Sequence, residues 1–133
     1  MTETFSDRYQ RGRDTLSSMG NDPDGIQGYR SLDPVVGPEV ERMLGEFCFG
    51  DVWSREGLDL RTRRIVTLTT IATLSRPKYL KTHIRSALEQ GFERREILEV
   101  FVHMIAYAGF PTALSAMDCA TEVFAELDAA AAD

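Results

Sequence analysis

Apolar residues recur every three or four positions through the second half of the chain, the period of helices with one buried face. Pro77 and Gly91 bracket one such segment and predict a helix over Lys78–Gln90. A second begins at Glu93 and runs to about Ala108, before Gly-Phe-Pro. The other predicted helices of this half cover Leu60–Leu74, in spite of its many β-branched residues, and Thr112–Leu127.

The first half is less regular. Ser6 suits the N-cap of a helix that stops near Gly20. Residues 21–37 carry three glycines and two prolines, which predicts an irregular arm with one short helical turn. Pro38 suits the first position of a helix to about Phe49, and residues 128–133 form a frayed tail. The pattern therefore predicts one all-α domain over residues 1–133, a helical bundle with five to six main helices.

Composition narrows the class of protein. The chain has 133 residues, 43% of them hydrophobic and 27% charged, as expected for a globular domain with its own core. A net charge of −6 argues against nucleic-acid binding, and no apolar run approaches the ~18 residues of a membrane span. The N-terminus does not resemble a signal peptide, and Cys48 and Cys119 lie far apart, so we expect a cytoplasmic protein without a disulfide.

The two histidines are the first candidates for chemistry. His103 stands four residues from both Glu99 and Tyr107, so the three share one helical face. A carboxylate within reach of an imidazole orients the ring and favours its protonated form, which suits a general acid. The alternative is a core histidine satisfied by Glu99. His83 either binds a carboxylate or donates a proton, or fills a polar position at a helix contact. A catalytic metal usually needs a third protein ligand, which the spacing does not demand, so no metal site is predicted.

An arginine cluster precedes and opens the Leu60–Leu74 helix. Four arginines fall within ten residues, and a guanidinium matches a carboxylate with two parallel hydrogen bonds. Trp53 can supply an apolar wall beside them. The alternatives are a solvated face paired with neighbouring acids and an aromatic that simply belongs to the core. The cluster consists of Arg55, Arg61, Arg63 and Arg64.

Three stretches of the chain carry a family resemblance. They read YQRGRDTLSSMG, FGDVWSREGLDLRTR and HIRSALEQGFERREILEVFVHMIAYAGFP, and together they span nearly the whole chain. The ordered pattern of the last stretch, from His83 through Glu99 and His103 to Tyr107, resembles the carboxymuconolactone decarboxylase family. The resemblance implies an all-helical fold of the alkylhydroperoxidase D-like type, with subunits assembled as rings, commonly trimers or hexamers. It also implies decarboxylation of γ-carboxymuconolactone, in aromatic catabolism, without a cofactor.

The same resemblance implies roles for individual residues. Arg55 and Arg63 would hold the carboxylates of the substrate. His83 would stabilise either the dienolate or the carboxylate, and His103, backed by Glu99, would return the proton. Trp53, Tyr79 and Tyr107 would complete the substrate pocket.

Two positions separate the chain from its relatives. Thiol-peroxidase relatives carry Cys-x-x-Cys where this chain has Arg76 and Tyr79, so a thiol peroxidase is not expected. Decarboxylases of the family often carry Glu in place of Tyr79, which leaves the substrate open. The alternatives are a cofactor-independent biosynthetic enzyme acting on a larger aromatic or polyketide-like acid, and a non-catalytic oligomeric scaffold.

Overall fold

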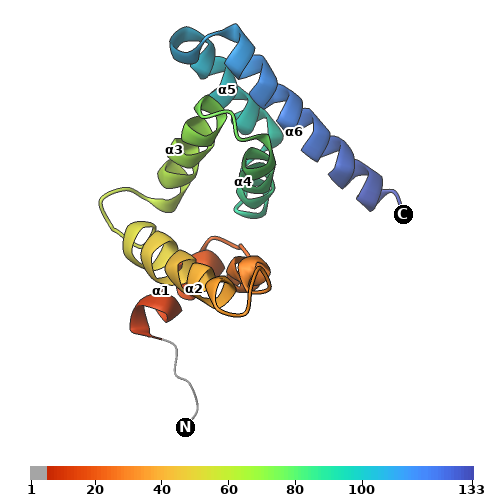
Figure 1. Cartoon of the computed structure of the whole chain (residues 1–133). Helices are drawn as coiled ribbons and strands as arrows, with labels where there is room; N and C mark the ends of the chain where they lie inside the picture. The colour runs from red at the N-terminus through yellow and green to blue at the C-terminus, as the bar shows by residue number, and fades with distance from the viewer. Residues whose placement is uncertain (1–5) are drawn as a thin grey trace. The chain divides into compact units, whose positions relative to one another are not determined.

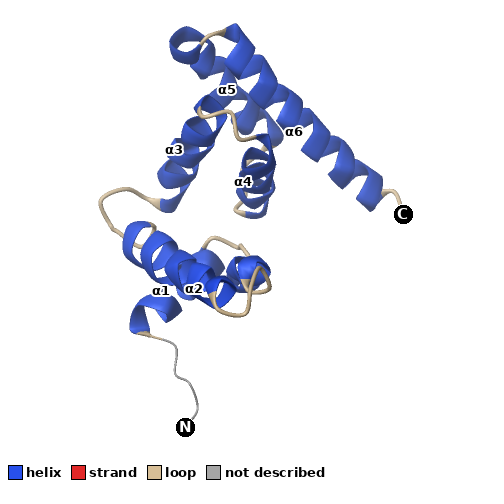
Figure 2. Ribbon diagram, in the orientation of Figure 1, coloured by secondary structure: helices blue, strands red, loops and turns tan. Residues whose placement is uncertain are grey.

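The structure, a computed structural model, describes residues 6–133, and every regular element in that range is a helix (Figures 1 and 2). The predicted all-α class is confirmed. The chain divides into two compact units, Met1–Leu60 and Arg61–Asp133. The prediction of one domain over the whole chain stays a prediction, as does the oligomeric ring. No helix in the described range is both long and apolar enough to cross a membrane.

The first unit begins with α1 (Asp7–Ser18) and η1, a 3₁₀-helix over Pro23–Tyr29. The hydroxyl of Ser6 accepts a hydrogen bond from the Tyr9 N–H at 3.1 Å, which confirms the predicted N-cap. The helix η1 lies within the predicted irregular arm and is longer than the single turn expected there.

The next helical segment starts earlier and ends later than predicted. It comprises α2 (Val36–Met43) and η2, a π-helix over Leu44–Val52. Pro38 is therefore the third residue of α2 and not the first. The start is set by Asp33, whose carboxylate accepts hydrogen bonds from the N–H groups of Val35 at 2.8 Å and Val36 at 2.7 Å.

Glycines allow α1 and η2 to pack closely in the first unit. A Cβ on Gly12 would lie 2.1 Å from the carbonyl oxygen of Gly45, and one on Gly50 would lie 2.3 Å from that of Arg8. Because neither backbone can give way, larger residues would push the two helices apart. Tyr9, Leu16, Met19, Ile26 and Trp53 form the core of this unit.

The second unit contains α3 (Leu60–Thr73), α4 (Pro77–Glu89), α5 (Arg94–Ala108) and α6 (Phe110–Ala131). Both α4 and α5 pack against α6, the longest helix (Figure 1). The core includes Leu68, Ile84, Ile97, Phe101 and Val123, all fully buried.

Local signals explain the helix boundaries of the second unit. The threonines of α3 donate to carbonyls four residues back, for example Thr67 to Arg63 at 2.8 Å, so a β-branched sequence still forms the predicted helix. Glu93 and Glu96 form a capping box that starts α5. The helix α6 starts two residues before the predicted Thr112 and continues to Ala131, so most of the predicted tail is helical. Within that tail, Asp128 binds Arg94 at 2.7 Å.

Candidate functional site

A buried arginine and a half-buried histidine meet between α3 and α4. The Nη1 atom of Arg64 lies 2.7 Å from Nδ1 of His83. Its Nε donates to the side-chain oxygen of Gln90 at 2.9 Å. Arg64 is only 1% exposed, the largest fully buried side chain described in the protein. Charged side chains are almost never buried so completely, so this pair stands out from the rest of the molecule.

The surroundings determine the protonation of both groups. Burial, and next the Arg64 charge, lower the pKa of His83 from 6.5 to about 4. Burial lowers the pKa of Arg64 to about 10, against the opposing field of Glu89. At neutral pH the guanidinium is therefore charged and the imidazole neutral. Because a guanidinium can only donate, Nδ1 is the acceptor and the ring proton sits on Nε2.

Sequence reasoning missed the partnership of Arg64 with His83 and the part played by Gln90. A signal was present, because Arg64, Leu68 and Ala72 recur at four-residue spacing along the buried side of α3. An arginine that interrupts an apolar row either snorkels to the surface or meets a polar partner inside. The position of Arg64 on that row separates it from the exposed Arg61, with which it was grouped.

His103 has surroundings different from those expected. It is exposed and packs on the ring of Tyr107, with ring centroids 5.4 Å apart. No hydrogen bond joins His103 to Glu99 in the described part of the chain, so the expected carboxylate contact is wrong for this structure. Glu99 instead lines a separate hollow of about 400 Å³ with Ile65 and Phe92. The alternative of a core histidine is also wrong, because α5 presents this face to solvent.

Trp53 and Arg55 line one hollow, without the other three arginines of the predicted cluster. It has a volume of about 390 Å³ and lies in the first unit, with Thr15, Asp59 and Leu60 among its other walls. Trp53 is buried and its ring lies 5.7 Å from that of Phe49, so it also belongs to the core.

The remaining two candidates lie in the second unit. Arg63 is partly buried and neighbours Arg64 on α3. Tyr79 is 45% exposed and precedes His83 by one turn of α4, so the two share a face. The Nζ atom of Lys78 lies 5.8 Å from the Tyr79 ring centroid. Within this unit, the structure therefore brings His83 together with Arg64 and brings His103 together with Tyr107.

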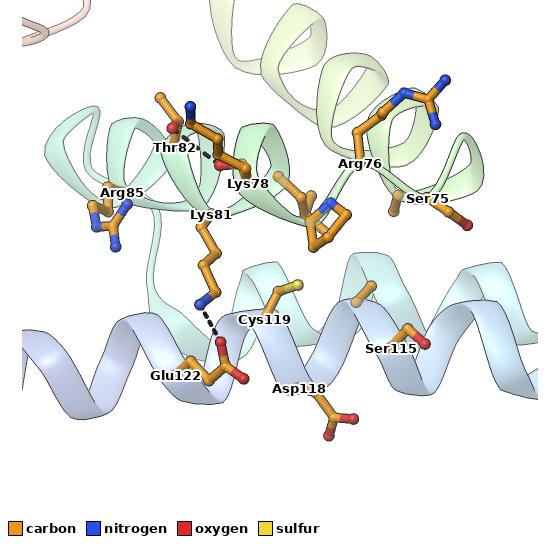
Figure 3. A pocket seen from close by; sticks show the side chains of 14 residues that line it. Ser75, Arg76, Lys78, Lys81, Thr82, Arg85, Ser115, Asp118, Cys119 and Glu122 are labelled. Carbon is orange, nitrogen blue, oxygen red and sulfur yellow. Dashed lines mark hydrogen bonds and ion pairs between the residues drawn. The ribbon is translucent and has the colours of Figure 1, made fainter.

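A further hollow lies along α4, and none of the predicted site residues lines it. Its volume is about 760 Å³, and α4 and α6 supply most of its walls (Figure 3). Lys81 reaches across it to Glu122 of α6, and Cys119 lies beside this ion pair. Burial raises the pKa of the Cys119 thiol. Arg76 and Lys78 point away from α6 (Figure 3), whereas Lys81 and Arg85 form ion pairs with acids of α6.

Among residues 6–133, no three His, Cys, Asp or Glu side chains lie close enough together to hold a metal ion.

Comparison with known proteins adds a family. The model of the carboxymuconolactone decarboxylase family matches residues 38–122, a range that contains all eight predicted site residues. The chain is 30% identical over 120 residues to the 4-carboxymuconolactone decarboxylase of Acinetobacter baylyi, covering 90% of this chain and 89% of that one.

Two further relatives match more locally. An uncharacterized 15.0 kDa protein from the nqo9–nqo10 intergenic region of Paracoccus denitrificans is 34% identical over 102 residues, covering 74% of this chain and 75% of its own. The nitrosuccinic acid decarboxylase of Metarhizium robertsii is 34% identical over 88 residues, covering 66% of this chain and 61% of its own. The family model spans well over half of this chain, and the bacterial decarboxylase matches nearly all of it. The chain therefore belongs to the carboxymuconolactone decarboxylase family.

Proposed function

We propose that the protein is a decarboxylase that needs no cofactor and acts on an unsaturated lactone acid, γ-carboxymuconolactone or a related acid. The observation that carries this proposal is the neutral His83 held 2.7 Å from the buried guanidinium of Arg64. The pair lies inside the segment that matches the family model. Two relatives that are named decarboxylases support the reaction class.

The chemistry explains why such a pair is useful. When the carbon–carbon bond to the carboxylate breaks, the electron pair moves through the alkene to the lactone carbonyl oxygen and carbon dioxide leaves. A proton then adds to carbon and the charge on oxygen disappears. The lactone is its own electron sink, so the protein has only to position the acid, stabilise the oxygen and return the proton.

The residues of the second unit divide these tasks in our proposal. His83 donates a hydrogen bond from Nε2 to the developing oxyanion, and Arg63 binds a carboxylate of the substrate. His103 returns the proton, with the ring of Tyr107 packed against it. Tyr79 lies one turn before His83 and contacts the substrate.

The first unit offers an acid-binding hollow of its own. Arg55 and Trp53 provide a cation and an aromatic wall there, which suits a small carboxylic acid.

A second substrate class is favoured by the relative from Metarhizium robertsii, which is named for nitrosuccinic acid. Loss of carbon dioxide beside a nitro group leaves a nitronate, whose charge also rests on oxygen. The same hydrogen-bond donor would serve both reactions, so a nitro acid is the second candidate substrate.

The test is carbon dioxide release and loss of ultraviolet absorbance with γ-carboxymuconolactone. Wild type should turn over, and His83→Ala should lose roughly 10²–10³-fold in kcat, the cost of removing one oxyanion donor. The control is Thr121→Ala, which removes an exposed hydroxyl that donates to the Met117 carbonyl, and it should match wild type. Folded wild type that releases no carbon dioxide from the lactone acid or from nitrosuccinate would overturn the proposal.

We also propose that the protein is a homo-oligomer, a trimer or hexamer. Apolar side chains gather where α5 meets α6, and a monomer would leave them in water. They include Tyr107, 85% exposed, Phe110, 61% exposed, and Leu114, 50% exposed. In sedimentation analysis Leu114→Asp should dissociate the assembly, whereas Leu127→Asp, far along α6, should not. A wild-type monomer at micromolar concentration would contradict this proposal.

A further inference from the structure

A cation and not a carboxylate is the hydrogen-bond partner of His83. The usual orienting partner of a working histidine is a carboxylate or carbonyl, which accepts the proton of Nδ1 and favours the imidazolium. Here the guanidinium of Arg64 faces Nδ1 at 2.7 Å and can only donate. The arrangement is the reverse of a carboxylate–histidine pair, because the partner donates to Nδ1 and favours the neutral imidazole.

We propose that Arg64 is a positioning residue that locks His83 as the neutral Nε2–H tautomer, making His83 a permanent hydrogen-bond donor that never transfers a proton. This inference rests on the proposed function, because the oxygen that receives the hydrogen bond is the one that becomes charged during decarboxylation. It also defines the substrate class as acids whose loss of carbon dioxide leaves an electron pair shared with an oxygen.

The geometry makes Arg64 a fixed partner. Its Nε is held by Gln90 at 2.9 Å, and the side chain is 1% exposed. Because α3 carries Arg64, while α4 carries His83 and ends at its C-cap Gln90, the guanidinium is held at two points of the neighbouring segment. A side chain so constrained keeps one orientation and sets the ring orientation of His83 with it.

The charge of Arg64 also acts through the ring. A cation at Nδ1 withdraws electron density from the imidazole and makes its Nε2–H a stronger donor to an oxyanion. The same field opposes protonation of Nδ1 and adds to burial, which is the larger cause of the lowered pKa of His83. The charged groups that act on this pair are Arg64 itself, from α3, and Glu89, from α4, whose field raises the pKa of Arg64.

Nuclear magnetic resonance of ¹⁵N-labelled histidine tests the lock without any substrate. The chain has two histidines, and His103→Gln leaves one imidazole to assign. In two-bond proton–nitrogen spectra of wild type, His83 should show an unprotonated Nδ1 and a protonated Nε2 throughout about pH 5–9, a range above its pKa of about 4. An Nδ1–H tautomer, or an imidazolium at pH 7, would overturn the inference.

Variants of the partners separate positioning from simple packing. Arg64→Met should give a mixture of tautomers and return the pKa of His83 toward 6.5. Since removing Arg64 from its buried site can unfold the protein, Gln90→Glu provides a nearly isosteric second variant. Its carboxylate offsets the Arg64 charge, so the pKa of His83 should rise while Nδ1 remains the acceptor.

The matched control is Glu89→Gln. It removes the opposing field without touching the contacts of Arg64 with His83 and Gln90, and should leave the tautomer unchanged. A His83 pKa that is the same in wild type and folded Gln90→Glu would overturn the electrostatic argument.

Steady-state kinetics test whether the fixed tautomer of His83 matters for turnover. With γ-carboxymuconolactone, Gln90→Glu should lower kcat by roughly tenfold with little change in KM, and should add an acid limb to the pH profile that wild type lacks. The two proposals fail separately. The spectra decide the tautomer even if no acid is turned over, whereas absence of turnover with the expected tautomer would overturn only the decarboxylase proposal.

Discussion

Each unit of the chain carries an arginine that contacts a buried or half-buried side chain, and the two arginines behave in opposite ways. In the first unit Arg30 donates two hydrogen bonds to the buried carboxylate of Glu41, at 2.7 and 3.0 Å, and this raises the pKa of Arg30. In the second unit Arg64 faces the imidazole of His83, and burial lowers the pKa of Arg64 to about 10.

The Arg30–Glu41 contact is an ion pair that stabilises the fold, whereas the Arg64–His83 contact places a charge beside a side chain that can act in catalysis. Glu41 also accepts a hydrogen bond from the buried hydroxyl of Tyr9 at 3.1 Å, so the charges and donors of that site satisfy one another. The guanidinium of Arg64 instead contacts the neutral ring of His83, whose Nε2–H can still donate a hydrogen bond. Strongly perturbed ionisation in a buried site is typical of functional groups, although structural networks produce it too. We therefore expect changes at Glu41 to alter stability and changes around His83 and His103 to alter activity.

The largest expected effect is on activity. His103→Ala removes the proposed proton donor and should lower kcat by roughly 10²–10⁴-fold, the range for general acid catalysis. Thermal unfolding should change little, because His103 is exposed. Tyr107→Phe keeps the ring that packs on His103 and should retain most activity. Full turnover by His103→Ala would remove this residue from the mechanism.

The next largest effect is a pH dependence of stability in the second unit. Unfolded His83 binds a proton below about pH 6.5, whereas the folded protein resists doing so until about pH 4. The free energy of unfolding should therefore fall as pH drops from 6.5 to 4, by up to roughly 3 kcal/mol.

Urea denaturation at several pH values measures this loss, and His83→Gln isolates it. The variant keeps the other titrating groups, so the difference between wild type and variant should vary over the same pH range. Parallel curves for the two proteins would show that His83 titrates normally in the folded state.

A smaller effect is expected from the carboxylate of the first unit. Glu41→Ala leaves the hydroxyl of Tyr9 without its acceptor and should cost about 2 kcal/mol of stability. Its neighbour Glu39 makes an exposed ion pair with Arg42, so Glu39→Ala should leave the melting temperature nearly unchanged. The decisive measurement is kcat per folded molecule, which should equal that of wild type in both variants. A loss of kcat in Glu41→Ala would erase the contrast between the units.

The smallest expected effect belongs to Tyr79. Its side chain is 45% exposed, so Tyr79→Phe removes a hydroxyl that water already reaches and should change kcat/KM by less than about threefold. A loss of kcat/KM greater than tenfold would instead show that the phenol of Tyr79 takes part in the chemistry, beside His83 on α4.

Much of the fold was readable from the sequence because its boundaries depend on local signals. Ser6 caps α1, Pro77 opens α4 and Glu93 starts α5, each through contacts within one turn of helix. Two of the errors arose where longer-range contacts act. The π-helix η2 continues past the predicted end at Phe49 and packs closely on α1 through glycines. The end of α6 continues past Leu127, where Asp128 meets Arg94 of α5.

The candidate site was predictable in its residue types and less so in its contacts. The sequence singled out His83, His103 and the arginine cluster as candidates, and the structure places one of these arginines, Arg64, in contact with His83. The expected Glu99–His103 pair is absent from the described residues. Spacing of four residues places two side chains on one face but does not decide which neighbour each one contacts.

The sequence by itself determined the helical elements, the acidic and globular character of the chain and the family resemblance, because periodicity, caps and motif spacing are properties of neighbouring residues. Tertiary structure alone decided that Arg64 is buried, that its partner is His83, and that the ring is neutral with its proton on Nε2. The physical reason is that the ionisation and tautomer of His83 depend on desolvation and on the neighbouring charge of Arg64. Arg64 lies 19 positions from His83 and 26 from Gln90 in the chain, and only tertiary structure brings the three side chains into contact.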